Sequence, residues 1–242
     1  MRKPFPRPLF EVSAECDLSF ETLVEMRTQT IFELVKDQFP NVQQLPVILT
    51  PINPANLPNP APPAYRFFSP EGDSIVQIGP RMFAVNMLKW DRGYGYFQDC
   101  LVRATRAFAE AMGKPLIQRY SLGFYNRFPA SSVEEVSELL KVSLPPGDLR
   151  FEQLVLQWLR ETETGQLLSQ ISTMPPDERM AEQYVSLNNI FSTMLSPATP
   201  LDVEHWLAWI DRTHQIARDV FWEMLTPEAQ NAWKESDVPT PA

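Results

Sequence analysis

Three short apolar runs follow one another between residues 65 and 88, and the links between them are too short to contain a helix. A five-residue turn with Pro70 and Gly72 separates the first two runs, and Gly79-Pro80 separates the last two. Strands joined by such short links pair antiparallel, because a parallel connection needs about a dozen residues or more. Both alternate sets of side chains in the third run are mostly apolar, which is typical of a strand covered on both faces. The sequence therefore predicts an antiparallel meander of residues 65–68, 74–78 and 81–88.

Helical patterns stand on both sides of this meander. Apolar residues at helical spacing predict helices over residues 20–39 and 94–112, each followed by a proline or glycine stop. A long C-terminal helix is expected to run to Leu225, with Thr199 as its cap. Shorter helices are predicted at 133–140 and 227–233, strands at 9–16, 42–50, 116–128 and 180–187, and a hairpin of 151–160 with 166–173 over a turn at 161–165.

These elements together predict an α+β fold, with a mostly antiparallel sheet and long helices packed on one face. The expected order is β-α-β-β-β-α-β at the start and a long helix at the C-terminus. We expect a single domain over residues 1–242, with tails at 1–8 and 236–242 and a connector at 51–63, where six of thirteen residues are proline. Subdivision near 129–132 is the alternative, but the second half alone has few strands to close a core. No internal repeat is evident in the sequence.

Charge and cysteine content argue against several classes of protein. The formal net charge is −9, which opposes binding to a phosphate backbone, so a nucleic-acid partner is not expected. Cys16 and Cys100, the only cysteines, lack the paired spacing of a disulfide framework or a zinc site. The N-terminus has no apolar segment of a secretory signal, and no apolar run approaches the roughly 20 residues of a membrane span. We therefore expect a cytoplasmic protein with no membrane, metal or cofactor.

Both histidines of the chain lie in the predicted C-terminal helix. His205 and His214 are nine residues apart, so they project to opposite sides of a helix and cannot share a metal ion. His214 lies on an apolar stripe, and Asp211 precedes it by three residues on the same face. A carboxylate-oriented imidazole of this kind could act as a general base. We favour a structural histidine at the edge of the core, because no nucleophile or oxyanion donor accompanies it in the sequence.

The strand expected after the central helix carries a second candidate site. Arg119, Tyr125 and Arg127 share one face of this strand, where two guanidinium groups could hold an anion or a partner's carboxylate. The alternative, which we favour, is a set of structural salt bridges to the helices. Asn126 on the opposite, apolar face and Asn86 in the meander are expected to be buried and to need hydrogen-bond partners.

Three blocks of the sequence resemble a sporadically distributed bacterial family of uncharacterised proteins of about this length. The blocks are residues 66–86, with Val76-Gln77-Ile78-Gly79, residues 119–127, with Tyr125-Asn126-Arg127, and residues 211–226, with His214, Phe221 and the Leu-Thr-Pro that follows. The opening Pro8-Leu9-Phe10-Glu11-Val12 is also similar to the start of the family. The resemblance covers nearly the whole chain and implies one domain, with no established activity, substrate or cofactor. Its patchy distribution implies a gene that travels beside a partner, as in defence or toxin–antitoxin systems.

Abundant aromatic residues without an assembled catalytic set favour a non-enzymatic binding or interaction protein. Trp206 and Trp209 flank the apolar stripe of the C-terminal helix, and we expect them at an interface with a partner protein or in a homodimer. Two alternatives stay open. One is a small-molecule pocket between the sheet and the helices, lined by the two arginines and the tyrosine named above. The other is a hydrolase that uses His214 with Asp211.

Overall fold

The computed structural model describes residues 9–19, 24–45, 64–129, 133–142, 155–174 and 184–234. Nine strands in these ranges form one sheet in the order β2-β3-β4-β5-β1-β6-β9-β8-β7, and every neighbouring pair is antiparallel. The strands are β1 (Leu9–Leu18), β2 (Asn41–Gln44), β3 (Tyr65–Phe68), β4 (Ser74–Gly79), β5 (Met82–Met87), β6 (Leu116–Pro129), β7 (Val155–Thr162), β8 (Gly165–Met174) and β9 (Tyr184–Pro200). The predicted α+β class and mostly antiparallel sheet are confirmed.

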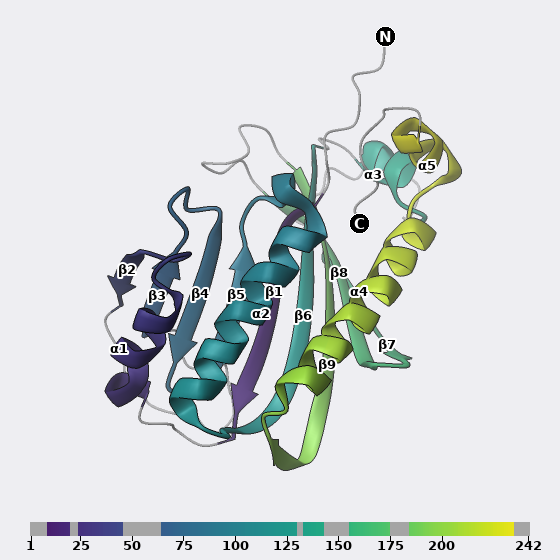
Figure 1. Cartoon of the computed structure of the whole chain (residues 1–242). Helices are drawn as coiled ribbons and strands as arrows, with labels where there is room; N and C mark the ends of the chain where they lie inside the picture. Colours follow the sequence, from purple (N-terminus) through teal and green to yellow (C-terminus); the bar gives the residue numbers. More distant parts are fainter. Residues whose placement is uncertain are drawn as a thin grey trace.

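Three helices lie on one face of this sheet, and two shorter helices pack together at one end of it (Figure 1). The first three are α1 (Val24–Val35), α2 (Gly93–Met112) and α4 (Val203–Met224), and the two shorter ones are α3 (Val133–Leu139) and α5 (Pro227–Lys234). A 3-10 turn, η1 (Trp90–Arg92), leads into α2. We call the sheet face that carries α1, α2 and α4 the helix face and the opposite one the open face.

Four strands separate α1 from α2, one more than the expected order β-α-β-β-β-α-β contains. The individual predictions do give four, because the strand expected at 42–50 is present as β2 on the outer side of β3, in addition to the meander. The predicted meander is confirmed as β3, β4 and β5. Both faces of β5 are buried, as its doubly apolar pattern predicts. Residues 1–8, 51–63, 130–132 and 236–242, which include the expected tails, connector and subdivision point, lie outside the described residues.

The C-terminal helix begins later than its sequence signal predicts. Thr199, the expected cap, belongs to β9, which runs for 17 residues and pairs with β6 as far as Pro200. Asp202 is the actual cap, and its carboxylate accepts a hydrogen bond of 3.0 Å from the backbone N–H of His205. Pairing of β9 with a central strand therefore overrides the helix-start pattern of Thr-Pro.

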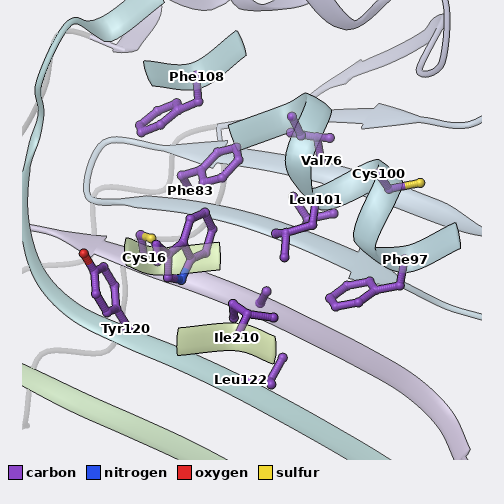
Figure 2. Close-up of a cluster of buried hydrophobic side chains, with 14 of the residues drawn as sticks. Cys16, Val76, Phe83, Phe97, Cys100, Leu101, Phe108, Tyr120, Leu122 and Ile210 are labelled. Atoms are coloured by element: carbon purple, nitrogen blue, oxygen red, sulfur yellow. The ribbon is translucent and has the colours of Figure 1, made fainter. Parts of the chain in front are cut away.

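The core fills the space between the sheet and its three covering helices (Figure 2). Phe83 of β5 stacks on Phe108 of α2 with ring centroids 4.4 Å apart, and Trp206 of α4 meets Phe83 edge-on at 5.8 Å. Cys16 and Cys100 are both fully buried there. Burial raises the pKa of both thiols, so they act as small apolar side chains.

A smaller apolar cluster joins α3 and α5 to the end of the sheet. Leu139 and Leu140 at the end of α3 pack with Leu225 beside Ile171 and Leu187 of β8 and β9. The backbone reinforces this contact, because residue 141 donates to the carbonyl of residue 224 at 2.8 Å and residue 226 donates to the carbonyl of Leu139 at 3.0 Å. The segment after β6 is thereby tied to the end of α4.

The strand order shows a repeated arrangement that the sequence does not reveal. In the first half β1 is followed by α1, then the strands ending in β5, and then α2. In the second half β6 is followed by α3, then the strands ending in β9, and then α4. Outward from the central β1–β6 pair the sheet reads β5, β4, β3 on one side and β9, β8, β7 on the other. The halves are therefore related by an approximate twofold axis between β1 and β6, and β7 is the counterpart of β3.

Candidate functional site

The two faces of β6 lie in different environments. Tyr120 and Leu122 point into the helix-face core, and the Tyr120 ring lies 6.2 Å from that of Trp206 (Figure 2). Residues alternate along a strand, so Arg119, Tyr125 and Arg127 project from the open face. The expected pocket between sheet and helices, lined by these three residues, is therefore wrong. They point away from the helices, and aromatic and aliphatic side chains fill the space between the layers.

Arg119 pairs with acids of the neighbouring strand β1. The favoured interpretation from the sequence, salt bridges to the helices, expects its partners on a helix instead. Its Nε lies 2.7 Å from Asp17 Oδ2, and its Nη2 lies 3.7 Å from Glu15 Oε1. The Nε–H is not directed at the aspartate oxygen, so the contact is an ion pair rather than a hydrogen bond. The register places Asp17 directly opposite Arg119. Arg127, on the same face, lies 4.9 Å over the ring of Tyr184 in a cation–π contact.

The proximity of the acids on β1 changes the protonation of one of them. Burial and, next, the carboxyl of Asp17 raise the pKa of Glu15, Arg119 opposes both effects, and the net result is a pKa of about 7. Close to neutral pH the pair therefore carries a proton that a single exposed glutamate would have lost.

Tyr125 lies along its own strand over Gly123, where the missing Cβ makes room for its ring. A Cβ at residue 123 would lie 2.8 Å from the Tyr125 hydroxyl, too close for both to keep their places. Burial, together with the charges of Glu11 and Glu15, raises the pKa of Tyr125 to about 12. The phenol therefore stays neutral at the centre of the open face.

A row of hydrogen bonds crosses the open face from β3 to β1. Arg66 Nε donates to Gln77 at 3.1 Å, Gln77 Nε2 donates to Asn86 at 2.7 Å, and Asn86 Nδ2 donates to Glu11 at 3.3 Å. Asn86 is buried and has the partners that a buried amide requires. On the helix face the buried Asn126 donates to the carbonyl of Leu187 on β9 at 3.1 Å. Both amides thus hold neighbouring strands together.

The polar groups of the open face mostly bond to one another. Within the described ranges, no group of three or more His, Cys, Asp and Glu side chains has the geometry of a metal site. The arrangement can recognise a surface, but it does not place an activated nucleophile beside a base and an oxyanion donor.

His214 and Asp211 connect α4 to α2 through one tyrosine. The imidazole of the buried His214 stacks on the Tyr94 ring with centroids 3.7 Å apart. Asp211 accepts a hydrogen bond of 2.5 Å from the Tyr94 hydroxyl and one of 3.0 Å from Gln98 Nε2. Burial and the Asp211 carboxylate raise the pKa of Tyr94 well above its ordinary value. These contacts support the structural interpretation of the histidine over the hydrolase.

The two tryptophans of α4 have different environments: the interface expectation is wrong for the buried Trp206 and stays a prediction for the partly buried Trp209. Trp206 has 0% of its surface exposed and lies in the core, so it is unavailable to a partner. Trp209 donates its Nε1–H to the carbonyl oxygen of Thr164, at 2.9 Å, in the turn between β7 and β8. Arg212 pairs with Glu163 of the same turn. The helix therefore fastens the β7–β8 hairpin to the body of the protein.

Strand β7 of this hairpin carries several exposed apolar side chains. Val155 is 50% exposed, Trp158 is 37% exposed and Leu159 is 60% exposed. Its partner among the described residues is β8 alone, so β7 forms one edge of the described sheet. Leu159 also continues a row of partly exposed apolar residues on the open face with Leu168 and Ile190.

Natural edge strands usually carry charged side chains, proline or bulges that prevent pairing with other chains. β7 has no proline and no bulge in its pairing with β8, and it carries one arginine and one glutamate. The sequence predicts the hairpin but not that β7 is an edge strand, because only the strand order of the folded sheet places it there. The run Val155–Thr162 shows no alternation of apolar and polar residues, which is the one signal that points to an unusual strand.

The three sequence blocks with a family resemblance lie in β3 to β5, in β6, and in α4 with the residues that follow it. In the part of the chain that the structure describes, no helix combines the length and the apolar character needed to cross a membrane. A comparison with models of protein families gives no match, and a comparison with curated proteins gives none either.

Proposed function

We propose that this chain is a non-enzymatic interaction protein that binds a polypeptide strand along the outer edge of β7. The observation that carries the proposal is the gathering of Val155, Trp158 and Leu159, all well exposed, on one strand at the end of the sheet. Exposed apolar side chains along a strand with free backbone groups are the features of β-strand addition. Backbone hydrogen bonds supply affinity in this mode, and side chains on alternate residues supply specificity.

The hairpin geometry identifies the backbone groups available on this edge. Thr162 pairs with Gly165 across a two-residue turn, so this pair is hydrogen-bonded and alternate pairs toward the start of β7 are hydrogen-bonded too. The residues between them direct their N–H and C=O groups outward. These outward residues are Val155, Gln157, Leu159 and Glu161.

The edge is held in a fixed place before any partner arrives. Trp209 and Arg212 of α4 bind the hairpin turn, and Thr193 of β9 donates a hydrogen bond to the carbonyl of Thr164. Gly165 packs so tightly on β9 that a Cβ would overlap the carbonyl oxygen of Ser192. A preorganised edge loses little conformational entropy on binding, which favours affinity.

The first half of the molecule supplies a precedent for an added strand. β3, the counterpart of β7, carries the four-residue strand β2 on its outer side. The same position beside β7 is what a partner strand would occupy. We also propose membership of the bacterial family that the three blocks resemble, and a partner protein encoded beside the gene accords with an interaction role.

The experiment compares edge variants in the native cell, with tagged protein at its natural level. Leu159→Lys places a charge on the edge, and Gln157→Pro removes an outward N–H without breaking the hydrogen bonds between β7 and β8. Val42→Lys is the matched control, because Val42 is also 50% exposed but lies on β2 at the other end of the sheet.

Proteins that co-purify with the wild type and with Val42→Lys are expected to be lost from both β7 variants, by about tenfold or more. Circular dichroism must show that all four proteins are folded. Retention of every co-purifying protein by both β7 variants contradicts the proposed function.

A further inference from the structure

We infer that the strand added at β7 is the β7 strand of a second copy of this chain, antiparallel to the first about a twofold axis at Trp158. The inference rests on the proposed function and names its partner. A cyclic dimer needs a surface that is complementary to itself, and β7 meets that condition in charge, in face and in hydrogen bonding.

The faces of the sheet restrict the register of such a pair. In a continuous sheet the helix face of one copy must continue into the helix face of the other. Even-numbered residues of β7 lie on the helix face, because Leu156 is in register with Ile171 and Leu187, and odd-numbered residues lie on the open face. The twofold axis must therefore pass through a residue, and not between two residues.

With the axis centred on Trp158, the N–H and C=O groups of all four outward residues of β7 form hydrogen bonds with the second copy. Gln157 then pairs with Leu159 of the second copy, and Val155 pairs with its Glu161, in hydrogen-bonded pairs on both sides of the axis. The exposed run of residues 155–161 is centred on this residue. A shift of one step along the strand, to Gln157 or Leu159, leaves an outward residue at one end without a partner from this run.

The side chains at the axis are complementary. The two Trp158 rings meet at a non-hydrogen-bonded pair, where side chains of opposite strands come closest and aromatic pairs stabilise the sheet. Arg160 of one copy lies opposite Leu156 of the other, so its aliphatic stem covers an apolar residue. Glu161 faces Val155. No two like charges are directly opposite.

Charge also favours this edge over the rest of the surface. Two copies of a chain with a net charge of −9 repel one another in general. The eight residues of β7 carry one arginine and one glutamate, so the strand itself is neutral. A single pair of strands buries an area near or below the lower limit of stable interfaces, about 1,200 Å². We therefore expect a dimer with a dissociation constant in the micromolar range.

Sedimentation velocity of the full chain from about 1 to 100 μM tests the dimer directly. The wild type and Val42→Lys are expected to shift from monomer to dimer over this range, and Gln157→Pro and Leu159→Lys are expected to stay monomeric. Single cysteines at 157, 158 and 159 then test the register under mild oxidation. Cys16 and Cys100 are buried and do not compete.

Disulfide crosslinking should be fastest for Trp158→Cys, because the two Cα atoms at the axis of a non-hydrogen-bonded pair lie about 4.5 Å apart. The double variant Gln157→Cys/Leu159→Cys keeps the tryptophan pair and should crosslink at least tenfold faster than either single variant. Faster crosslinking at 157 or 159 alone overturns the register. A wild type that stays monomeric at 100 μM overturns the dimer. That result leaves the proposed function untouched, because the co-purification experiment with the edge variants tests it separately.

Discussion

The imidazole of His214 lies flat on the phenol ring of Tyr94, with centroids 3.7 Å apart and planes 5° from parallel. The hydroxyl of the same tyrosine donates to Asp211, so the two residues that resemble a catalytic pair in sequence meet on one side chain of α2. The tyrosine ring covers one face of the imidazole. Packing and hydrogen bonding explain this pair without a reaction.

His214→Ala is expected to lower the free energy of unfolding by about 2 kcal/mol, since it removes a buried ring from the α2–α4 contact. His205→Ala is the matched control, because His205 is exposed on the same helix and should change stability by less than about 0.5 kcal/mol. Urea unfolding followed by tryptophan fluorescence measures both. Equal stability of His214→Ala and wild type would remove the structural interpretation.

Glu15 gives the protein a pH dependence of defined sign. The pKa of Glu15 is about 7 in the folded chain and near its ordinary value of 4.5 in the unfolded chain. The folded state therefore binds more protons between these values. The stabilisation is complete below about pH 4.5 and is lost as the pH rises through 7.

Glu15→Gln should thus gain stability relative to wild type as the pH rises from 4.5 to 8, on the order of 1 kcal/mol or more. Urea unfolding at each pH measures the change. Glu33→Gln is the control, because hydrogen bonding to Lys36 lowers the pKa of Glu33 below its ordinary value of 4.5, so its stability relative to wild type should stay constant over this pH range. A constant difference between Glu15→Gln and wild type across this range would contradict the raised pKa.

Gly165 is expected to tolerate no side chain. Its φ of 120° is rare for other residues, and a Cβ would overlap the carbonyl oxygen of Ser192. Gly165→Ala should lower the free energy of unfolding by about 2 to 4 kcal/mol, as measured by thermal or urea denaturation. The control is Gly95→Ala in the first turn of α2, where a Cβ meets open space, and it should be neutral or slightly stabilising. If both variants behave alike, the tight packing of the hairpin turn on β9 is not as described.

Trp209→Phe should loosen the β7–β8 hairpin while leaving the rest of the sheet intact. The change removes the N–H that binds the Thr164 carbonyl, a loss of about 1 kcal/mol. Hydrogen exchange read by mass spectrometry should become faster in residues 155–174 and stay unchanged in β3 to β5. Trp90→Phe, in the turn η1 before α2, is the control that should leave exchange in the hairpin unchanged.

Local patterns were sufficient to predict most of the elements, but not their environments. The meander and α2 follow from short links and from an uninterrupted helical stripe, which depend on near neighbours in the sequence. β9 was predicted only as far as residue 187, because the register that extends it to Pro200 comes from β6, more than sixty residues away. Trp206 and Trp209 lie three residues apart on one side of a helix, and only the position of α4 over the sheet buries one and brings the other to a turn.

The sequence did not predict the exposed edge at β7 either, because this feature also depends on the arrangement of distant elements. Whether β7 is an edge or a central strand depends on the strand order, and no residue of β7 encodes that order. The row of hydrogen bonds from Arg66 to Asn86 and Glu11 also depends on the strand order. Glu11 and Asn86 are 75 residues apart in sequence and meet only because β1 lies beside β5. The open face that carries Arg119, Tyr125 and Arg127 follows from the placement of helices on the other side.

The β1–β6 pair is a seam at which the protein could be made in two pieces. Each piece would keep its own meander and covering helix. Reassembly would restore the β1–β6 pairing, with Arg119 and Asp17 on opposite sides of the joint, together with the contacts between α2 and α4. Chains ending at residue 113 and beginning at residue 114, between α2 and β6, should then co-purify when expressed together. Such complementation would make the seam a place where the two halves can be exchanged, labelled or swapped between relatives independently.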